Sequence, residues 1–260
     1  MHLKQPIGIF DSGLGGLSVA KEIHALLPGE DILFLADQAN LPYGEKSQAE
    51  IERLAQAAVP TLLAEGAKLV VIACNSASVS IIEKLRLRYP ETPFVAVVPM
   101  IKPAAEASAT GTIAVFATET TLKSTMYADL KHRFAKDTVV LDVPAPQWVG
   151  MVESGQFAAK FVEKPVADAI HRGADQVVLG CTHYPFLRTL IEPAAEGKAA
   201  VLDSGAAVAR QVERILAANE NRATGGSGET RYLTSGPPEQ PSLVASKILN
   251  RPVRFRAVGH

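Results

Sequence analysis

The chain has 260 residues, of which 26 are basic and 27 acidic, so its formal net charge at pH 7 is −1. This balance provides no broad basic surface for nucleic acid or an anionic membrane, and we expect a small molecule as the partner. The longest apolar run, Phe94 to Ile101, is far shorter than the roughly 20 residues that cross a bilayer. With two cysteines and no recognisable export signal, we expect reduced thiols and a cytoplasmic protein.

Short apolar runs alternate with longer segments of helical periodicity, which is the pattern of a parallel sheet with crossover helices. The predicted fold class is α/β, with two pseudo-symmetric three-layer domains of mostly parallel sheet and an active site in the cleft between them. The first half is predicted to contain strands over Ile7 to Asp11, Asp31 to Ala36, Leu69 to Cys74 and Phe94 to Val98, and helices over Leu17 to Leu27, Ser47 to Glu65 and Val79 to Arg88.

The second half repeats this alternation. Its predicted strands are Thr112 to Ala117, Thr138 to Val143, Gln176 to Gly180 and Ala200 to Leu202, and its predicted helices are Leu122 to Phe134, Gln147 to Glu153, Phe157 to Arg172, Pro185 to Glu192 and Ala206 to Ala218. The polar, glycine-rich stretch Asn221 to Gly228 is predicted to be a mobile surface loop.

The segment from Thr230 to Val258 has room for only two short strands and a helix, which we expect to pack onto the first half. This organisation predicts a discontinuous domain, residues 1–98 plus 206–260, and an inserted domain, residues 99–205. The chain would cross between them near Pro99 and Ser204, where the two crossings would form a hinge.

Two segments of the first half return in the same order in the second. Ile7 to Ser12 is matched by Ile113 to Thr118, and Gly66 to Cys74 by Gly173 to Cys181. Each copy of the second segment ends in one of the two cysteines. If the halves face each other, the two thiols meet on opposite sides of one cleft. Such a pair can remove a proton from one face of a carbon and return it to the other.

Each cysteine follows a predicted strand and precedes a helix. The carboxyl ends of strands are where open α/β sheets bind ligands, and a helix N-terminus lowers a thiol pKa that is about 8.5 in free cysteine. The alternative is that Cys74 and Cys181 are small core residues, but matched positions in a repeat favour a functional pair.

The loop Asp11 to Gly16 follows the first strand and opens a helix. It is not a dinucleotide fingerprint, because Ser18 stands where the third glycine would fall. Its amides could bind a substrate carboxylate, or the loop could be a plain tight turn. In the second half, the corresponding turn, Thr118 to Thr121, offers hydroxyl groups instead.

Asp11 and His183 are the ionisable residues nearest to these turns, and either could tune a thiol or move its proton. Their alternative roles are a helix cap or turn for Asp11 and a hydrogen-bonded strand end for His183. Pro42, Tyr43 and Gly44 could close over a ligand or form only a turn. The chain has no CxxC, HExxH, P-loop or GxSxG pattern, so we expect no metal, cofactor or nucleotide site.

The chain resembles the glutamate racemases of the cofactor-independent aspartate/glutamate racemase superfamily. The resemblance is carried in the family's order by Ile7 to Gly16, Leu41 to Gly44, Ala73 to Ser78, Ala117 with Thr118, Thr121 and Ser124, Val152 with Glu153, and Leu179 to Pro185. It implies interconversion of L- and D-glutamate by two cysteine bases without pyridoxal phosphate or metal, which provides D-glutamate for peptidoglycan. We also expect a homodimer.

The resemblance also implies roles for single residues. Cys74 and Cys181 would be the two acid/base thiols, with Asp11 and His183 as catalytic groups beside them. Glu153 would lie near the rim of the site. The substrate-binding set is Asp11, Ser12, Pro42, Tyr43, Gly44, Cys74, Asn75, Ser76, Thr118, Thr121, Cys181, Thr182 and His183.

The chain departs from the family pattern at three places. Ser76 stands where threonine is commoner, and Ala145 stands where a third cysteine is frequent. The first strand begins close to Met1, without the N-terminal extension through which some members bind a cell-wall precursor as an activator, so we do not expect that regulation.

Other readings remain open. A cysteine hydrolase or decarboxylase would need only one of the two thiols. A two-lobed binding protein would share the symmetry and the hinge but would have no need for the thiols. Among racemases, an enzyme acting on aspartate is the nearest competitor, because carboxylate-binding donors do not measure the length of the substrate side chain.

Overall fold

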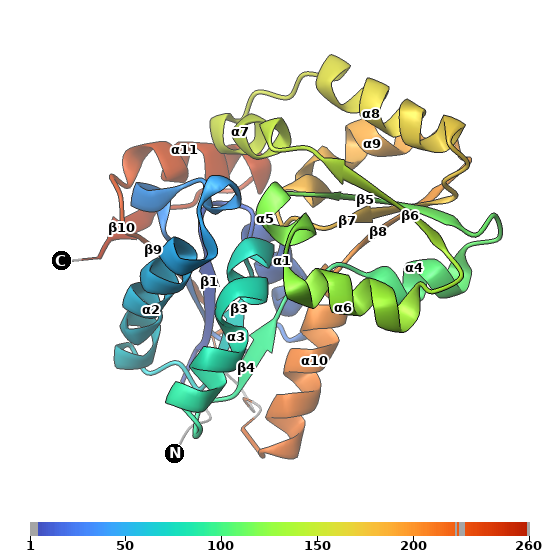
Figure 1. Cartoon of the computed structure of the whole chain (residues 1–260). Helices are drawn as coiled ribbons and strands as arrows, with labels where there is room; N and C mark the ends of the chain where they lie inside the picture. Colours follow the sequence, from blue (N-terminus) through green and yellow to red (C-terminus); the bar gives the residue numbers. More distant parts are fainter. Residues whose placement is uncertain (1–4, 222, 224–226, 259–260) are drawn as a thin grey trace.

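The structure is a computed structural model that describes residues 5–221, 223 and 227–258. Its strands form two sheets in which every neighbouring pair is parallel. The larger sheet has the order β10-β9-β2-β1-β3-β4 and the smaller has the order β6-β5-β7-β8. Figure 1 shows the two sheets with helices on both faces of each, which is the α/β architecture predicted from the alternation of strands and helices.

The larger sheet has two apolar cores, one on each face. Alternate residues of its central strand separate between them: Ile7 and Ile9 face one core, and Phe10 faces the other. Its strands are β1 (Ile7–Asp11), β2 (Ile32–Ala36), β3 (Leu69–Ile72), β4 (Phe94–Ala96), β9 (Thr230–Thr234) and β10 (Phe255–Ala257). Helices α1 (Leu17–Leu26), α10 (Gly205–Ala218) and α11 (Glu239–Ile248) pack on the first face, and α2 (Gln48–Ala64) and α3 (Asn75–Arg88) on the second.

The smaller sheet is covered in the same way. Its strands are β5 (Thr112–Ala117), β6 (Val139–Pro144), β7 (Gln176–Leu179) and β8 (Ala200–Asp203). Helices α7 (Gln147–Ser154), α8 (Lys160–His171) and α9 (Arg188–Ala194) pack on one face, and α4 (Ile101–Ala107) and α6 (Thr125–Phe134) on the other. The remaining short helices are α5 (Glu119–Leu122), η1 (Gln38–Asn40), η2 (Tyr43–Glu45) and η3 (Tyr184–Leu187).

The sequence repeat is also a structural repeat. The strand order β2-β1-β3-β4 in the larger sheet has the counterpart β6-β5-β7-β8 in the smaller one. The register also corresponds, because Ile7 pairs with Leu69 and Ile113 pairs with Gln176. The strands that precede the two cysteines, β3 and β7, therefore occupy equivalent places in the two sheets.

The C-terminal segment adds two strands to the first sheet, because β9 pairs with β2 and β10 pairs with β9. Figure 1 shows these strands and α11 beside the N-terminal elements. The domain boundaries near residues 98 and 205 remain a prediction. The strand content of the sheets is consistent with it, because β5 to β8 form the smaller sheet and all other described strands form the larger one.

Several helices differ from the sequence prediction. Helix α3 begins at Asn75 and not at Val79, so Cys74 stands directly at its N-terminus. The predicted helix from Leu122 to Phe134 is interrupted, because the Ser124 hydroxyl accepts the amide of Tyr127 and caps a new helix, α6. Helix α4 was not predicted, since only Ile101 and Ala104 of its seven residues are fully buried.

The predicted mobile loop Asn221 to Gly228 includes residues 222 and 224–226, which lie outside the described residues. At its start, the carbonyl of Asn221 accepts a hydrogen bond of 2.7 Å from Lys68 Nζ, and Lys68 forms a buried ion pair with Glu30. Among the described helices, none combines the length and the apolar character needed to cross a membrane.

Candidate active site

The two cysteines lie at equivalent ends of the two sheets and line one cavity. Cys74 follows β3 and precedes α3, while Cys181 follows β7 and Gly180 and precedes η3. Both thiols are free and buried, with 6% and 7% of each residue exposed. The cavity between them has a volume of about 20 Å³. At roughly 10–15 Å³ per water, it holds one or two water molecules, so an amino acid can enter only if the cleft opens.

Most of the residues expected to bind substrate line this cavity. The lining residues are Ser12, Pro42, Tyr43, Gly44, Cys74, Asn75, Ser76, Thr118, Val149, Cys181, Thr182 and His183. Asp11 and Thr121 are fully buried behind this surface. Val149, on α7, was missed because a single apolar residue in an amphipathic helix gives no signal that separates a cavity wall from the core.

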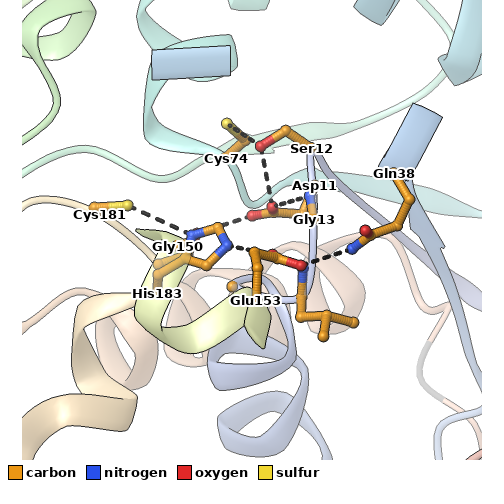
Figure 2. A network of polar contacts seen from close by, with 12 residues as sticks. Asp11, Ser12, Gly13, Gln38, Cys74, Gly150, Glu153, Cys181 and His183 are labelled. Carbon is orange, nitrogen blue, oxygen red and sulfur yellow. Dashed lines mark hydrogen bonds and ion pairs between the residues drawn. The ribbon is translucent and has the colours of Figure 1, made fainter. Parts of the chain in front are cut away.

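The environment of Cys74 keeps its thiol protonated. Burial and the nearby carboxylate of Asp11 raise the pKa of Cys74 to about 12, although the Ser12 hydroxyl and the Ala77 amide act in the opposite direction. The Ser12 oxygen lies 3.4 Å from the sulfur and 3.4 Å from Oδ1 of Asp11. Figure 2 shows Ser12 in this position, between the thiol and the carboxylate.

Cys181 has an imidazole as its neighbour. Nδ1 of His183 lies 3.6 Å from the Cys181 sulfur, and Nε2 lies 2.6 Å from Oε1 of Glu153 (Figure 2). Burial lowers the pKa of His183, but its contacts with Cys181 and Glu153 outweigh burial and raise that pKa well above its ordinary value. Burial likewise opposes ionisation of Glu153, yet its hydrogen bond and charge interaction with His183 lower its pKa. An imidazolium paired with a carboxylate therefore lies beside the second thiol.

Asp11 joins the two halves of the site. Oδ1 accepts the amide of Gly13 at 2.8 Å, and Oδ2 accepts the hydroxyl of Thr182 at 2.9 Å. Burial raises its pKa, although His183, the Gly13 amide and the Thr182 hydroxyl favour the charged form. Thr182 directly follows Cys181, so this carboxylate of the first sheet is hydrogen-bonded next to the thiol of the second.

The glycine-rich loop after β1 does bind a carboxylate, but the carboxylate belongs to the protein. The amide of Leu14 donates to Oε1 of Glu153 at 2.7 Å, while the Gly13 amide is taken by Asp11. A Cβ atom at Gly13 would lie 2.2 Å from the Glu153 carboxylate, and one at Gly15 would lie 2.4 Å from His183 Nδ1. The glycines therefore let Glu153 and His183 approach the loop. In this conformation the Gly13 and Leu14 amides donate to carboxylates of the protein, and binding of a substrate carboxylate by the loop remains a prediction.

Tyr43 contributes its ring to the cavity, because its hydroxyl is engaged elsewhere. It donates a 2.6 Å hydrogen bond to Oδ2 of Asp37. Asp37, which directly follows β2, also accepts hydrogen bonds from Asn40 and, at 2.5 Å, from the Ser235 hydroxyl after β9. Asp37 was not singled out in the sequence, because one of its partners, Ser235, lies 198 residues away along the chain. It fixes the loop that carries Pro42, Tyr43 and Gly44.

Hydroxyl and amide groups complete the cavity wall. Ser76 Oγ and Thr118 Oγ1 lie 2.9 Å apart across the cleft, and Thr118 donates to Thr121 at 3.1 Å. The Nδ2 atom of Asn75 is buried without a hydrogen-bond partner, which is costly unless a ligand supplies an acceptor. Within the described ranges, no three His, Cys, Asp or Glu side chains cluster as metal ligands would.

Comparison with known proteins places this site in a family. Residues 7–212 match the family model described as Asp/Glu/Hydantoin racemase. The chain belongs to this racemase family. Among its curated relatives, a glutamate racemase of Pseudomonas aeruginosa is 44% identical over 250 residues, which is 95% of this chain and 94% of the relative. One from Pseudomonas putida is 43% identical over 258 residues, covering 98% and 95% of the two chains.

Solved structures of the racemase family have the same fold. A glutamate racemase isoform from Bacillus anthracis superposes with a TM-score of 0.86 at 27% identity, over 99% of this chain and 98% of that one. The Escherichia coli glutamate racemase, in complex with L-glutamate and the activator UDP-MurNAc-ala, has a TM-score of 0.83 at 31% identity, over 97% of both chains. The Francisella tularensis enzyme, in complex with D-glutamate, has a TM-score of 0.82 at 27% identity, over 98% of both.

Proposed function

We propose that this protein interconverts L- and D-glutamate by proton transfer between the α-carbon and two thiols, those of Cys74 and Cys181. Its curated relatives at 42–44% identity are glutamate racemases, and solved relatives are complexes with L-glutamate or with D-glutamate. The observation that carries the proposal is that two strand-end thiols, from equivalent strands of two similar sheets, line one closed cavity.

The reaction requires one thiolate and one thiol at the same time. The thiolate removes the α-proton from one face, and the opposite thiol delivers a proton to the other face. Charge that develops on the α-carboxylate is stabilised by fixed hydrogen-bond donors in a site from which water is excluded. In the reverse direction the two cysteines exchange roles.

The raised pKa of Cys74 predicts how substrate activates it. In the closed cavity, burial and Asp11 hold the pKa of the thiol at about 12, so the protonated form predominates at neutral pH. Glutamate brings an ammonium group, and a positive charge near Asp11 opposes the effect of that carboxylate on the thiol. The Ser12 hydroxyl, 3.4 Å from the sulfur, is placed to stabilise a thiolate by donating to it.

Cys181 is served by His183. An imidazolium can donate its Nδ1 proton toward the sulfur and so favour a thiolate, and it can return a proton when the thiol form is needed. Glu153 accepts the hydrogen bond from Nε2 and holds the ring in this orientation. The two bases are therefore unequal, with a hydroxyl and a carboxylate beside one and an imidazolium beside the other.

The substrate is bound by groups from both sheets. The unpaired Nδ2 of Asn75 is available to a carboxylate oxygen, and the neighbouring Ser76 offers a hydroxyl group. Thr118 and Thr121 offer hydroxyl groups across the cleft. Thr182 and Asp11 form the base of the site near the ammonium group. These donors line one cavity or lie directly behind its wall, so they can surround an amino acid with two carboxylates once the cleft has opened to admit it.

Proton NMR in deuterated buffer tests this function. We expect the protein to exchange the α-proton of L-glutamate and produce D-glutamate, and to act weakly or not at all on L-aspartate. The Cys74→Ser and Cys181→Ser variants should each lose racemisation. Racemisation at the wild-type rate in either variant would refute the two-base proposal and point to a single-thiol enzyme. Binding of glutamate without exchange would identify a binding protein.

We further propose a cytoplasmic homodimer that supplies D-glutamate for peptidoglycan. Two free thiols in a catalytic pair require a reducing compartment, which supports the cytoplasm. Phe157 and Leu243 are 44% and 70% exposed, and apolar side chains of this kind are covered in dimer interfaces. Sedimentation equilibrium tests the dimer, and a monomer mass at micromolar concentration would contradict it.

A further inference from the structure

A large open cavity lies outside the closed one and shares a residue with it. It has a volume of about 610 Å³ and is bounded by the segment from Gly44 to Gln48, by Ser80 on α3, and by Glu119, Thr120, Lys123, Ser124 and Pro146. Gly44 belongs to the walls of both cavities. We name the larger one the vestibule. A ligand that reached the thiols from the vestibule would have to pass Gly44.

The wall between the vestibule and the closed cavity is a contact between the two halves of the chain. Gly44 comes from η2, beside the larger sheet, and Thr118 stands directly after β5 of the smaller one. A Cβ atom on Gly44 would lie 2.6 Å from Cγ2 and 2.8 Å from Cβ of Thr118. Backbone and side chain therefore meet without space for a further atom at this point of the wall.

Thr120 adds hydrogen bonds to this contact, beside the Ser76 and Thr118 hydroxyl pair that also spans the cleft. The hydroxyl of Thr120 donates to the carbonyl oxygen of Gly44 at 2.9 Å, and it lies 3.3 Å from the carbonyl oxygen of Lys46. Thr120 belongs to the second half of the chain, whereas both acceptors belong to the first. Thr120 is not among the residues that line the closed cavity. It can act on a ligand there only through Gly44.

We propose that Thr120 is a latch of the site: its bond to Gly44 is one of the contacts that stabilise the closed cleft, and it lowers how often the cavity opens for substrate entry and product release. The latch breaks when the loop from Pro42 to Lys46 moves away from Thr118, and it forms again after the ligand has entered. The effect of the latch on turnover rests on the function proposed above. Its effect on opening of the cleft does not depend on that function.

The size of the effect follows from the chemistry of the bond. When the cleft opens, water replaces the partners of this neutral hydrogen bond. Its loss should therefore change the equilibrium constant between the open and closed cleft by only about twofold to tenfold. Thr120→Val removes the hydroxyl and keeps the shape of the side chain, so the closed fraction should fall by this factor. Thr120→Ser keeps the hydroxyl and should behave as the wild type.

Alkylation of the thiols by iodoacetamide, without any substrate, measures the opening directly. Cys74 and Cys181 are the only cysteines, and both are buried in the closed cleft. We expect Thr120→Val to be alkylated about twofold to tenfold faster than the wild type, because loss of one hydrogen bond raises the fraction of molecules with an open cleft by that factor. Gly44→Ala should also be alkylated faster, because its methyl group cannot fit against Thr118.

Thr110→Val is the matched control. Its hydroxyl also donates to a backbone carbonyl, that of Gly173 at 2.8 Å, but both residues lie in the second half and away from the cleft. This variant should be alkylated at the wild-type rate. Thermal unfolding of each variant, measured in parallel, identifies any that fails to fold.

Steady-state kinetics supply the second measurement. Because the latch stabilises the empty closed cleft and the occupied one alike, its loss should cancel in the apparent affinity and leave KM for both enantiomers within about twofold of wild type. A Thr120→Val variant that is alkylated at the wild-type rate would overturn the proposal, and so would one with wild-type alkylation and a raised KM. Faster alkylation in a protein without racemase activity would support the latch and reject the proposed function.

Discussion

The carboxylate of Glu153 lies 2.6 Å from Nε2 of His183 while the same oxygen accepts the amide of Leu14 at 2.7 Å. Its second oxygen accepts a hydrogen bond from Gln38 at 2.9 Å. Glu153 is on α7, and Leu14 and Gln38 follow strands of the larger sheet. One side chain therefore orients the imidazole beside Cys181 and also ties the two halves of the chain together.

Glu153→Gln should destabilise the protein in a pH-dependent way. The raised pKa of His183 adds stability below about pH 6.5 that is lost as pH rises through the folded-state value, and the lowered pKa of Glu153 adds stability above about pH 4.5. The variant should lose about 1–3 kcal/mol near pH 5.5, and less at high pH where His183 is neutral. Urea unfolding near pH 5.5 and at high pH measures the two losses of unfolding free energy. Glu163→Gln, at an exposed position of α8, is the control. A loss that is the same at both values would contradict the charge pairing.

The buried ion pair of Lys68 and Glu30 makes a separate prediction about stability. Their charged atoms are 2.6 Å apart, and both side chains are at most 2% exposed. Lys68→Met leaves a buried carboxylate without its partner and should cost about 3–5 kcal/mol of unfolding free energy. The double variant with Glu30→Gln should recover part of this loss. Lys84→Met, which breaks the exposed pair with Glu52, should cost less than about 1 kcal/mol. Equal losses in the two single variants would show that burial does not decide the effect.

Tyr43→Phe should reduce stability but not substrate affinity. The hydroxyl of Tyr43 donates to Asp37, so only the ring faces the cavity. Loss of a buried hydrogen bond to a carboxylate should cost about 1.5–3 kcal/mol, while KM changes little. Thermal unfolding and steady-state kinetics measure the two effects, with Tyr89→Phe as a control that breaks no described hydrogen bond. A large rise in KM without loss of stability would mean that the hydroxyl turns to the substrate.

Asn75→Ala should reduce substrate affinity but not stability, which is the reverse of the effect expected for Tyr43→Phe. Its Nδ2 atom is buried without a partner, so removing the amide should leave the free energy of unfolding within about 1 kcal/mol of wild type. If Asn75 donates to a substrate carboxylate, KM should rise by about tenfold to a hundredfold, as expected for a charge-assisted hydrogen bond. Denaturant unfolding and initial-rate kinetics distinguish the two effects. A loss of several kcal/mol with unchanged KM would assign Asn75 to the scaffold instead.

Sequence patterns were sufficient to predict the two sheets and most of the cavity wall. Strands of a parallel sheet are buried on both faces, so β1, β3, β5 and β7 appear as short apolar runs. The functional residues follow these runs directly, at Asp11, Cys74, Thr118 and Cys181. Parallel pairing brings such positions to one edge of each sheet, so order along the chain predicts proximity within each sheet.

Contacts between the two halves could not be predicted in this way. The partners of Glu153 and Thr120 come from distant segments, and these contacts depend on how the sheets are oriented relative to one another. The use of the Gly13 and Leu14 amides by protein carboxylates also depends on this orientation. Helix α4 escaped prediction because it is short, contains Pro103, and buries only Ile101 and Ala104.

Isotope incorporation at low conversion tests the central claim, that two different thiols act on opposite faces of one carbon. When L-glutamate reacts in deuterated buffer, the D-glutamate formed should carry deuterium at the α-carbon, because the thiol that delivers the new proton has exchanged with solvent. The L-glutamate recovered at the same time should retain its original proton. Protium transferred from substrate to product, or deuterium appearing equally in both enantiomers, would show that a single base moves the proton and would contradict the account.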